Sequence, residues 1–135
     1  MLLDKIGIVT LQGRFNYGNR LQNYAMEEVI KNEGFAPTSL ILNRRPNALS
    51  RIRSVAKKVL GRQESPEHTM SKERLLAFDR FNQLMTFQEI VDPYSDEVSD
   101  YAFVVAGSDQ IWAFKSFAYD EDWAFLQFAR PEQRI

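Results

Sequence analysis

The chain has 135 residues, 44% hydrophobic and 26% charged, with a formal net charge of −1. These values are typical of one globular domain, and so small a charge gives no overall attraction to nucleic acid. The chain has no cysteine and one histidine, which excludes disulfides, thiolate ligands and a multi-histidine metal centre, so we expect no metal. No apolar run approaches the roughly 20 residues of a membrane span, and the early first strand leaves no room for a signal peptide. We therefore expect a cytoplasmic protein.

The first third of the chain predicts a strand, a helix and a second strand. Residues 5–10 are a strand candidate, residues 20–33 have helical periodicity between Asn19 as N-cap and Gly34 as C′ residue, and residues 38–42 supply a second strand candidate. This order predicts a βαβ unit. The expected inward face of the helix is its apolar one, formed by Leu21, Ala25, Met26, Val29 and Ile30. Its polar positions lie off that face and include Gln22, Asn23, Glu27 and Lys31.

Residues 44–62 interrupt this alternation. They contain seven basic residues and no acidic one, and their apolar residues have the spacing of an inserted amphipathic helix. Such a helix can lie on an anionic membrane surface, hold a polyanionic glycan, dock on a partner protein or present a solvated face. The first alternative would place the protein peripherally at the inner face of the membrane.

A helix capped by Ser71 and two strands, residues 87–91 and 102–106, complete the predicted elements. Their order predicts an α/β fold with a Rossmann-like, doubly wound and mostly parallel sheet in the strand order 3-2-1-4. The first and fourth strands are then neighbours, and the polar loops 11–20 and 107–116 face each other. Ligands bind at such a crevice in open α/β sheets.

The loop after the first strand has features of an anion site. Gly13 and Gly18 allow close approach of a ligand, and the amides that begin the next helix attract negative charge. A cation in the first turn, here Arg20, is disfavoured by about 0.3–1 kcal/mol, which a bound anion would offset. Arg14 could close over the same anion. The alternative is a glycine turn with Arg20 in solvent, and the glycine spacing does not match a dinucleotide fingerprint.

The loop after the fourth strand presents a second group of polar residues. Asp109 can act as a general base, orient a sugar hydroxyl or cap a short helix. Trp112 can pack in the core or offer a flat face to a sugar ring. The residue pattern leaves these alternatives open.

Two sequence blocks together resemble the N-terminal part of the polysaccharide pyruvyl transferase family. They are Asn-Tyr-Gly-Asn-Arg-Leu-Gln-Asn at 16–23 and Gly-Ser-Asp-Gln-Ile-Trp at 107–112, and the strand at 6–10 and the segment 125–128 also fit that family. The resemblance covers nearly the whole chain. It implies transfer of the enolpyruvyl carbons of phosphoenolpyruvate to two sugar hydroxyls, as a cyclic ketal, in cell-surface polysaccharide biosynthesis. It also implies two Rossmann-like domains with a cleft between them, similar to B-type glycosyltransferases.

The resemblance implies a set of site residues but no cofactor beyond phosphoenolpyruvate as the donor substrate. Asp109 is the candidate catalytic residue. Asn16, Asn19 and Asp109 would contact hydroxyls or an anion, and Tyr17 and Trp112 would offer packing or stacking surfaces. The acceptor would be a sugar or a lipid-linked glycan. The candidate substrate-binding residues are Asn16, Tyr17, Gly18, Asn19, Arg20, Asn23, Gly107, Ser108, Gln110 and Trp112.

Residues 1–135 then correspond to a single N-terminal, acceptor-side domain. The second domain of the family would follow them and would hold most of the basic residues that grip phosphoenolpyruvate. We therefore expect these residues to be inactive alone, with an exposed sheet edge at the fourth strand that could pair in a homodimer. Two alternatives are a nucleotide-sugar glycosyltransferase of the same architecture and a non-catalytic module that docks on an anionic membrane or a partner.

Overall fold

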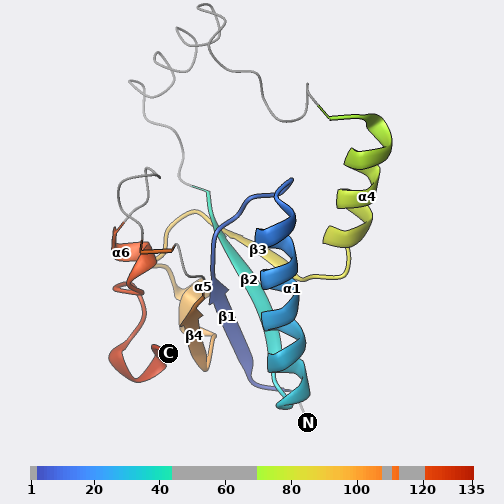
Figure 1. The fold of residues 1–135 in the computed structure, drawn as a ribbon. Coiled ribbons are helices and arrows are strands. Elements are labelled where there is room, and N and C mark those ends of the chain that lie inside the picture. Colours follow the sequence, from blue (N-terminus) through green and yellow to red (C-terminus); the bar gives the residue numbers. More distant parts are fainter. Residues whose placement is uncertain (1–2, 44–69, 108–110, 113–120) are drawn as a thin grey trace, which may run out of the picture.

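The structure, a computed structural model, describes residues 3–43, 70–107, 111–112 and 121–135, so the predicted basic helix at 44–62 lies outside it. Four strands form one parallel sheet in the order β3-β2-β1-β4 (Figure 1). This α/β architecture and strand order confirm the prediction. The strands are β1 (Lys5–Val9), β2 (Ala36–Leu42), β3 (Phe87–Ile90) and β4 (Phe103–Ala106).

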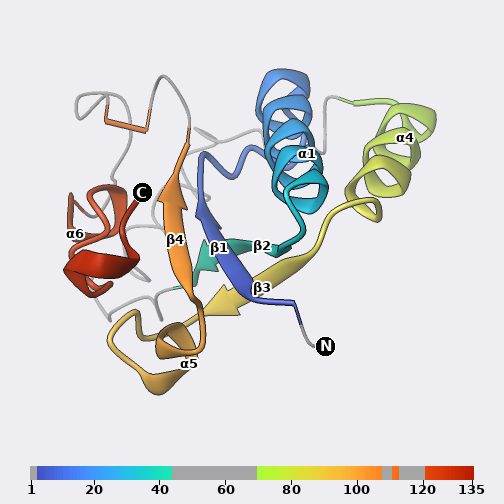
Figure 2. The ribbon, with the colours of Figure 1, turned by 90° about the horizontal axis from the view of Figure 1, so that it is seen from below.

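Helices lie on both faces of the sheet (Figure 2). One face carries α1 (Tyr17–Asn32), with α4 (Lys72–Asn82) beside it, and the other carries α5 (Asp96–Ser99) and α6 (Glu121–Ala124). A 3-10 helix, η1 (Pro131–Gln133), follows α6. Coverage of both faces is typical of parallel sheets, whose strands are buried on each side.

Helix α1 begins three residues earlier than the pattern predicts. Its N-cap is Asn16, not Asn19, because Asn16 has an extended backbone and its Oδ1 accepts a hydrogen bond of 3.2 Å from the Asn19 amide. Residues 17–20 therefore form the first turn of the helix and not a loop. The predicted C-terminal signal is confirmed, since Gly34 follows the helix with φ of 85°.

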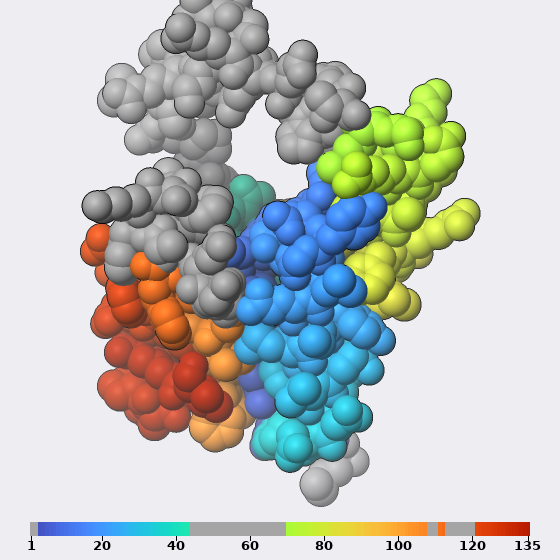
Figure 3. Space-filling model, viewed as in Figure 1, coloured from blue at the N-terminus to red at the C-terminus, as the bar shows by residue number. Residues whose placement is uncertain are grey.

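The orientation of α1 differs most from the prediction. Leu21 and Val29 are 58% and 61% exposed, whereas Arg20, Asn23 and Glu27 are buried. The polar side of the helix faces the sheet because it finds hydrogen-bond partners there. The apolar side of α1 lines a groove whose opposite wall includes Val105 and Ile135. Figure 3 shows α1 between α4 and the C-terminal residues.

The face under α5 and α6 holds the apolar core. Trp123 and Phe128 stack at 4.6 Å between ring centroids and close this cluster. Burial of such surface stabilises the fold by about 25 cal/mol per Å². The fully or nearly buried members are Val9, Leu40, Ile90, Val98, Tyr101, Val104, Ile111, Trp123, Ala124, Leu126 and Ala129.

The outer edge of β4 is paired, contrary to the expected open edge. Ile135 donates its amide to the Val104 carbonyl at 2.9 Å, and Ala106 donates to the Ile135 carbonyl at 3.2 Å. These bonds continue the parallel pattern for one bridge, between Val104 and Arg134. Within the described parts of the chain, no helix combines the length and the apolar character needed to cross a membrane.

Candidate functional site

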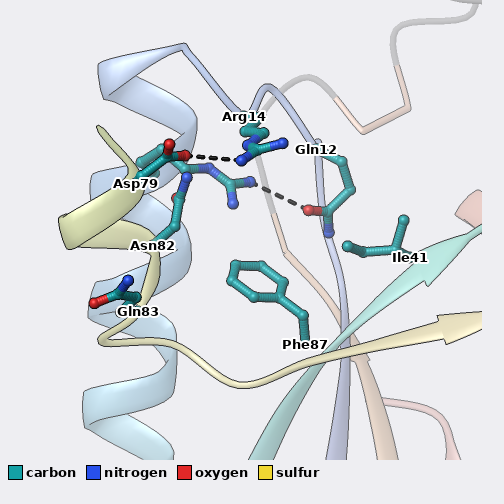
Figure 4. A pocket seen from close by; sticks show the side chains of 8 residues that line it. Gln12, Arg14, Ile41, Asp79, Asn82, Gln83 and Phe87 are labelled. Carbon is teal, nitrogen blue, oxygen red and sulfur yellow. Dashed lines mark hydrogen bonds and ion pairs between the residues drawn. The ribbon is translucent and has the colours of Figure 1, made fainter. Parts of the chain in front are cut away.

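A pocket of about 560 Å³ opens at the carboxyl end of β1, between the β1–α1 loop, α4 and the start of β3. Its position agrees with the rule that ligands of open α/β sheets bind beyond the carboxyl ends of the strands. The wall combines two arginines, one carboxylate, three amides, an aromatic ring and an aliphatic side chain. They are Gln12, Arg14, Arg20, Ile41, Asp79, Asn82, Gln83 and Phe87 (Figure 4).

Arg20 is the central charge of the pocket and is only 3% exposed. Its Nη2 donates to Gln12 Oε1 at 3.2 Å and to the Leu11 carbonyl at 3.5 Å. Its guanidinium lies 5.5 Å from the centre of the Phe87 ring, a cation–π distance. Burial lowers the pKa of Arg20, and the negative field of Glu27 partly restores it. The side chain remains a cation, because arginine does not deprotonate in proteins.

Two buried polar atoms of the pocket residues have no hydrogen-bond partner. Among the described residues, the Arg20 Nε donor and the Asn82 Oδ1 acceptor are both unsatisfied. A buried polar group without a partner costs about 1–3 kcal/mol, so such groups need an explanation. Both atoms belong to residues that line this pocket.

Arg14 and Asp79 form an ion pair on the exposed side of the pocket. The Arg14 Nη2 to Asp79 Oδ1 distance is 2.8 Å, and the two side chains are 63% and 44% exposed. An exposed pair of this kind contributes about 0–1 kcal/mol, so Arg14 can exchange its partner easily. Arg14 and Arg20 against one carboxylate give the pocket lining a net positive charge.

A second polar cluster lies below the pocket, along the inner side of α1. Ser39 Oγ lies 2.7 Å from Glu27 Oε1 and 2.9 Å from Asn23 Oδ1, and the Thr86 amide donates to Glu27 Oε2 at 3.1 Å. Burial raises the pKa of Glu27, while the bonds from Ser39 and Thr86 and the charge of Lys31 oppose that rise. Asn23, predicted to contact substrate, instead joins α1 to β2 within this cluster.

The other predicted residues of the first block have structural partners. The Tyr17 ring packs against the Phe78 ring at a tilt of 34°, with ring centroids 4.4 Å apart, and its hydroxyl accepts from Arg74 Nε at 3.2 Å. Asn16 caps the helix, because its Oδ1 accepts a hydrogen bond from the backbone amide of Asn19. Gly18 is exposed in the first turn. Of this block, Arg20 alone lines the pocket at the end of β1, so the structure does not gather these residues around one ligand.

Half of the second block, Ser108, Asp109 and Gln110, lies outside the described residues. Gly107 donates its amide to the Val9 carbonyl at 3.0 Å, and a Cβ there would overlap the Met26 side chain. Trp112 is half exposed, and its indole donates to the Ala124 carbonyl at 3.2 Å. It joins the chain to α6.

Sequence reasoning missed most of the pocket wall. Gln12 lies in the loop shortly after β1, separated from it by Thr10 and Leu11, so its position near a strand end was the available signal. Asp79, Asn82 and Gln83 belong to α4 and its end, where the sequence pattern shows an amphipathic helix and gives no sign of a pocket. Phe87 reads as an ordinary strand residue.

The residues that the structure describes contain no group of three or more histidine, aspartate or glutamate side chains placed to hold a metal ion. Comparison with protein-family models, curated proteins and solved structures gives no match to the chain.

Proposed function

We propose that this chain is the acceptor-side domain of a pyruvyl transferase-like enzyme, with a Rossmann-like fold that forms one half of a B-type glycosyltransferase architecture. The observation that carries the proposal is the buried Arg20 in a pocket at the carboxyl end of β1. The sequence blocks at 16–23 and 107–112 support the family, and the parallel β3-β2-β1-β4 sheet is compatible with it.

The proposed reaction joins phosphoenolpyruvate to two hydroxyls of one sugar. Two C–O bonds form at C2 of phosphoenolpyruvate, and the C2–O bond to phosphate breaks. One hydroxyl proton goes to C3, which becomes a methyl group, and the other leaves with inorganic phosphate. A base near the acceptor must take the hydroxyl protons, and Asp109 remains our candidate for it.

The pocket residues supply binding and orientation for the acceptor in this scheme. The Gln12, Asn82 and Gln83 amides can hold hydroxyls, since an amide both donates and accepts. Phe87 offers an apolar surface to a sugar ring. An acceptor held in this way loses less entropy on reaching the transition state, which lowers the activation barrier.

The test is phosphate release from phosphoenolpyruvate by the protein at its natural length, with a panel of sugars as acceptors and the ketal detected by mass spectrometry. Release that depends on a sugar, and that Arg20→Met reduces at least about tenfold, supports the proposal. The control is Arg80→Met, which removes an exposed arginine of α4 outside the pocket. Transfer from a nucleotide sugar without phosphate release would overturn it in favour of a glycosyltransferase.

A further inference from the structure

The pocket at the end of β1 contains unsatisfied groups of two kinds. Arg20 brings a buried guanidinium whose Nε has no partner among the described residues, and Asn82 brings a buried amide oxygen in the same state. A ligand that completes both needs an acceptor oxygen for Arg20 and a polar group for Asn82. A purely apolar ligand would leave both atoms unsatisfied.

The charge of the pocket selects an anion at Arg20. Asp79 already pairs with Arg14 at 2.8 Å, and no carboxylate among the described lining residues pairs with Arg20. Glu27 lies on the same helix, but its carboxylate accepts hydrogen bonds from Ser39 and the Thr86 amide. A guanidinium binds phosphate and carboxylate oxygens through charge-assisted hydrogen bonds, which are about twice as strong as neutral ones.

The other residues of the pocket lining favour a ligand with a hydroxylated ring. An asparagine amide can turn over and exchange its oxygen and nitrogen, and a hydroxyl satisfies either arrangement because it donates and accepts. Phe87 contributes a ring beside the guanidinium, and Ile41 adds apolar surface. A volume of about 560 Å³ lies in the usual range for pockets that hold a small organic molecule.

We propose that this pocket binds a sugar that carries an anionic group, phosphate or carboxylate, with the anion at Arg20 and a hydroxyl at Asn82. Arg14 joins the anion by exchanging Asp79 for it, which costs little because that pair is exposed. The inference deepens the proposed function by naming the class of its acceptor. It can also stand without that function, because it concerns binding alone.

The experiment is calorimetric titration of the chain at low salt with glucose 6-phosphate, glucuronate, neutral glucose and inorganic phosphate. We expect either or both anionic sugars to bind at least about tenfold more tightly than glucose and inorganic phosphate. The comparison of glucose 6-phosphate with glucuronate identifies the anion. Equal affinity for glucose would overturn the anionic part, and equal affinity for inorganic phosphate would overturn the sugar part.

Variants of the lining residues test whether the ligand binds in this pocket. Arg20→Met should weaken binding at least about tenfold, Arg20→Lys should weaken it less, and Arg80→Met should leave it unchanged although it removes the same charge. If circular dichroism shows that Arg20→Met does not fold, Asn82→Asp decides, because it adds a repelling carboxylate to the pocket wall. Unchanged affinity in the folded pocket variant would overturn the proposal.

This experiment separates the two proposals. Binding of an anionic sugar without any phosphate release from phosphoenolpyruvate would refute the transferase and leave the pocket assignment intact. Pyruvyl transfer to a neutral sugar by a protein that does not bind anionic sugars would do the reverse.

Discussion

The two faces of the sheet differ in the polar side chains that they bury, although the apolar Ile8 is also buried on the α1 face. Under α5 and α6 the buried residues are apolar, among them Leu40, Val104 and Trp123. Under α1 the buried set includes Arg20 and Glu27, together with Asn23 and Ser39. Both kinds of residue are close to fully buried, so the difference lies in chemistry and not in depth.

Because of this difference, we expect the α5 and α6 face to contribute mainly to stability and the α1 face mainly to ligand recognition. Apolar contacts on the α5 and α6 face are non-directional and gain free energy in proportion to the area removed from water. Polar contacts on the α1 face fix positions through hydrogen bonds but gain little net free energy, because water satisfied the same groups before folding. The pocket at the end of β1 opens on the α1 side, where fixed polar groups are available to a ligand.

The largest effect is expected for truncation on the apolar face. Leu40→Ala removes a fully buried side chain from the cluster and should lower the free energy of unfolding by about 2–5 kcal/mol. Urea denaturation measures this loss. Leu76→Ala, at an exposed position of α4, is the matched control and should change stability by less than about 0.5 kcal/mol. Equal losses in the two variants would contradict the assignment of the core.

On the polar face, loss of a hydrogen-bond acceptor should matter more than loss of volume. Glu27→Leu keeps the side chain large but deprives Ser39 Oγ and the Thr86 amide of their acceptor, at a cost of about 1–3 kcal/mol. Thermal or urea unfolding near neutral pH checks this. Glu33→Leu, at the exposed end of α1, should be nearly neutral. A stabilised Glu27→Leu variant would show that the cluster is dispensable.

The pH dependence of stability tests the same cluster without removing the Glu27 side chain. Because burial raises the pKa of Glu27 in the folded protein, its proton is held more firmly there than in the unfolded chain. The contribution of Glu27 is therefore full below the ordinary carboxyl pKa and is lost as pH rises through the raised folded value. Glu27→Gln cannot titrate, so the stability of the wild type relative to this variant should fall across that window. A constant difference between pH 4 and 8, about the range in which perturbed carboxyls titrate, would contradict the raised pKa.

Sequence patterns predicted the sheet better than the helix upon it. Apolar runs identify the four strands, and their spacing gives the parallel order. The inner side of α1 could not be predicted, because periodicity marks Leu21 and Val29 as the buried positions while Ser39 on a neighbouring strand supplies partners for the opposite side. The pocket depends on where α4 packs, which is a tertiary contact between Tyr17 and Phe78 that no local pattern contains.

The smallest effect is expected at the exposed pair of the polar face. Arg14 and Asp79 are both partly open to water, so a double-mutant cycle with Arg14→Gln and Asp79→Asn should give a coupling energy of about 0.2–1 kcal/mol. The coupling should fall as salt rises, because exposed charges are screened. A coupling above about 2 kcal/mol, insensitive to salt, would mean that the pair is structural. Arg14 could not then leave Asp79 for a ligand, and Arg20 would have to bind the anion by itself.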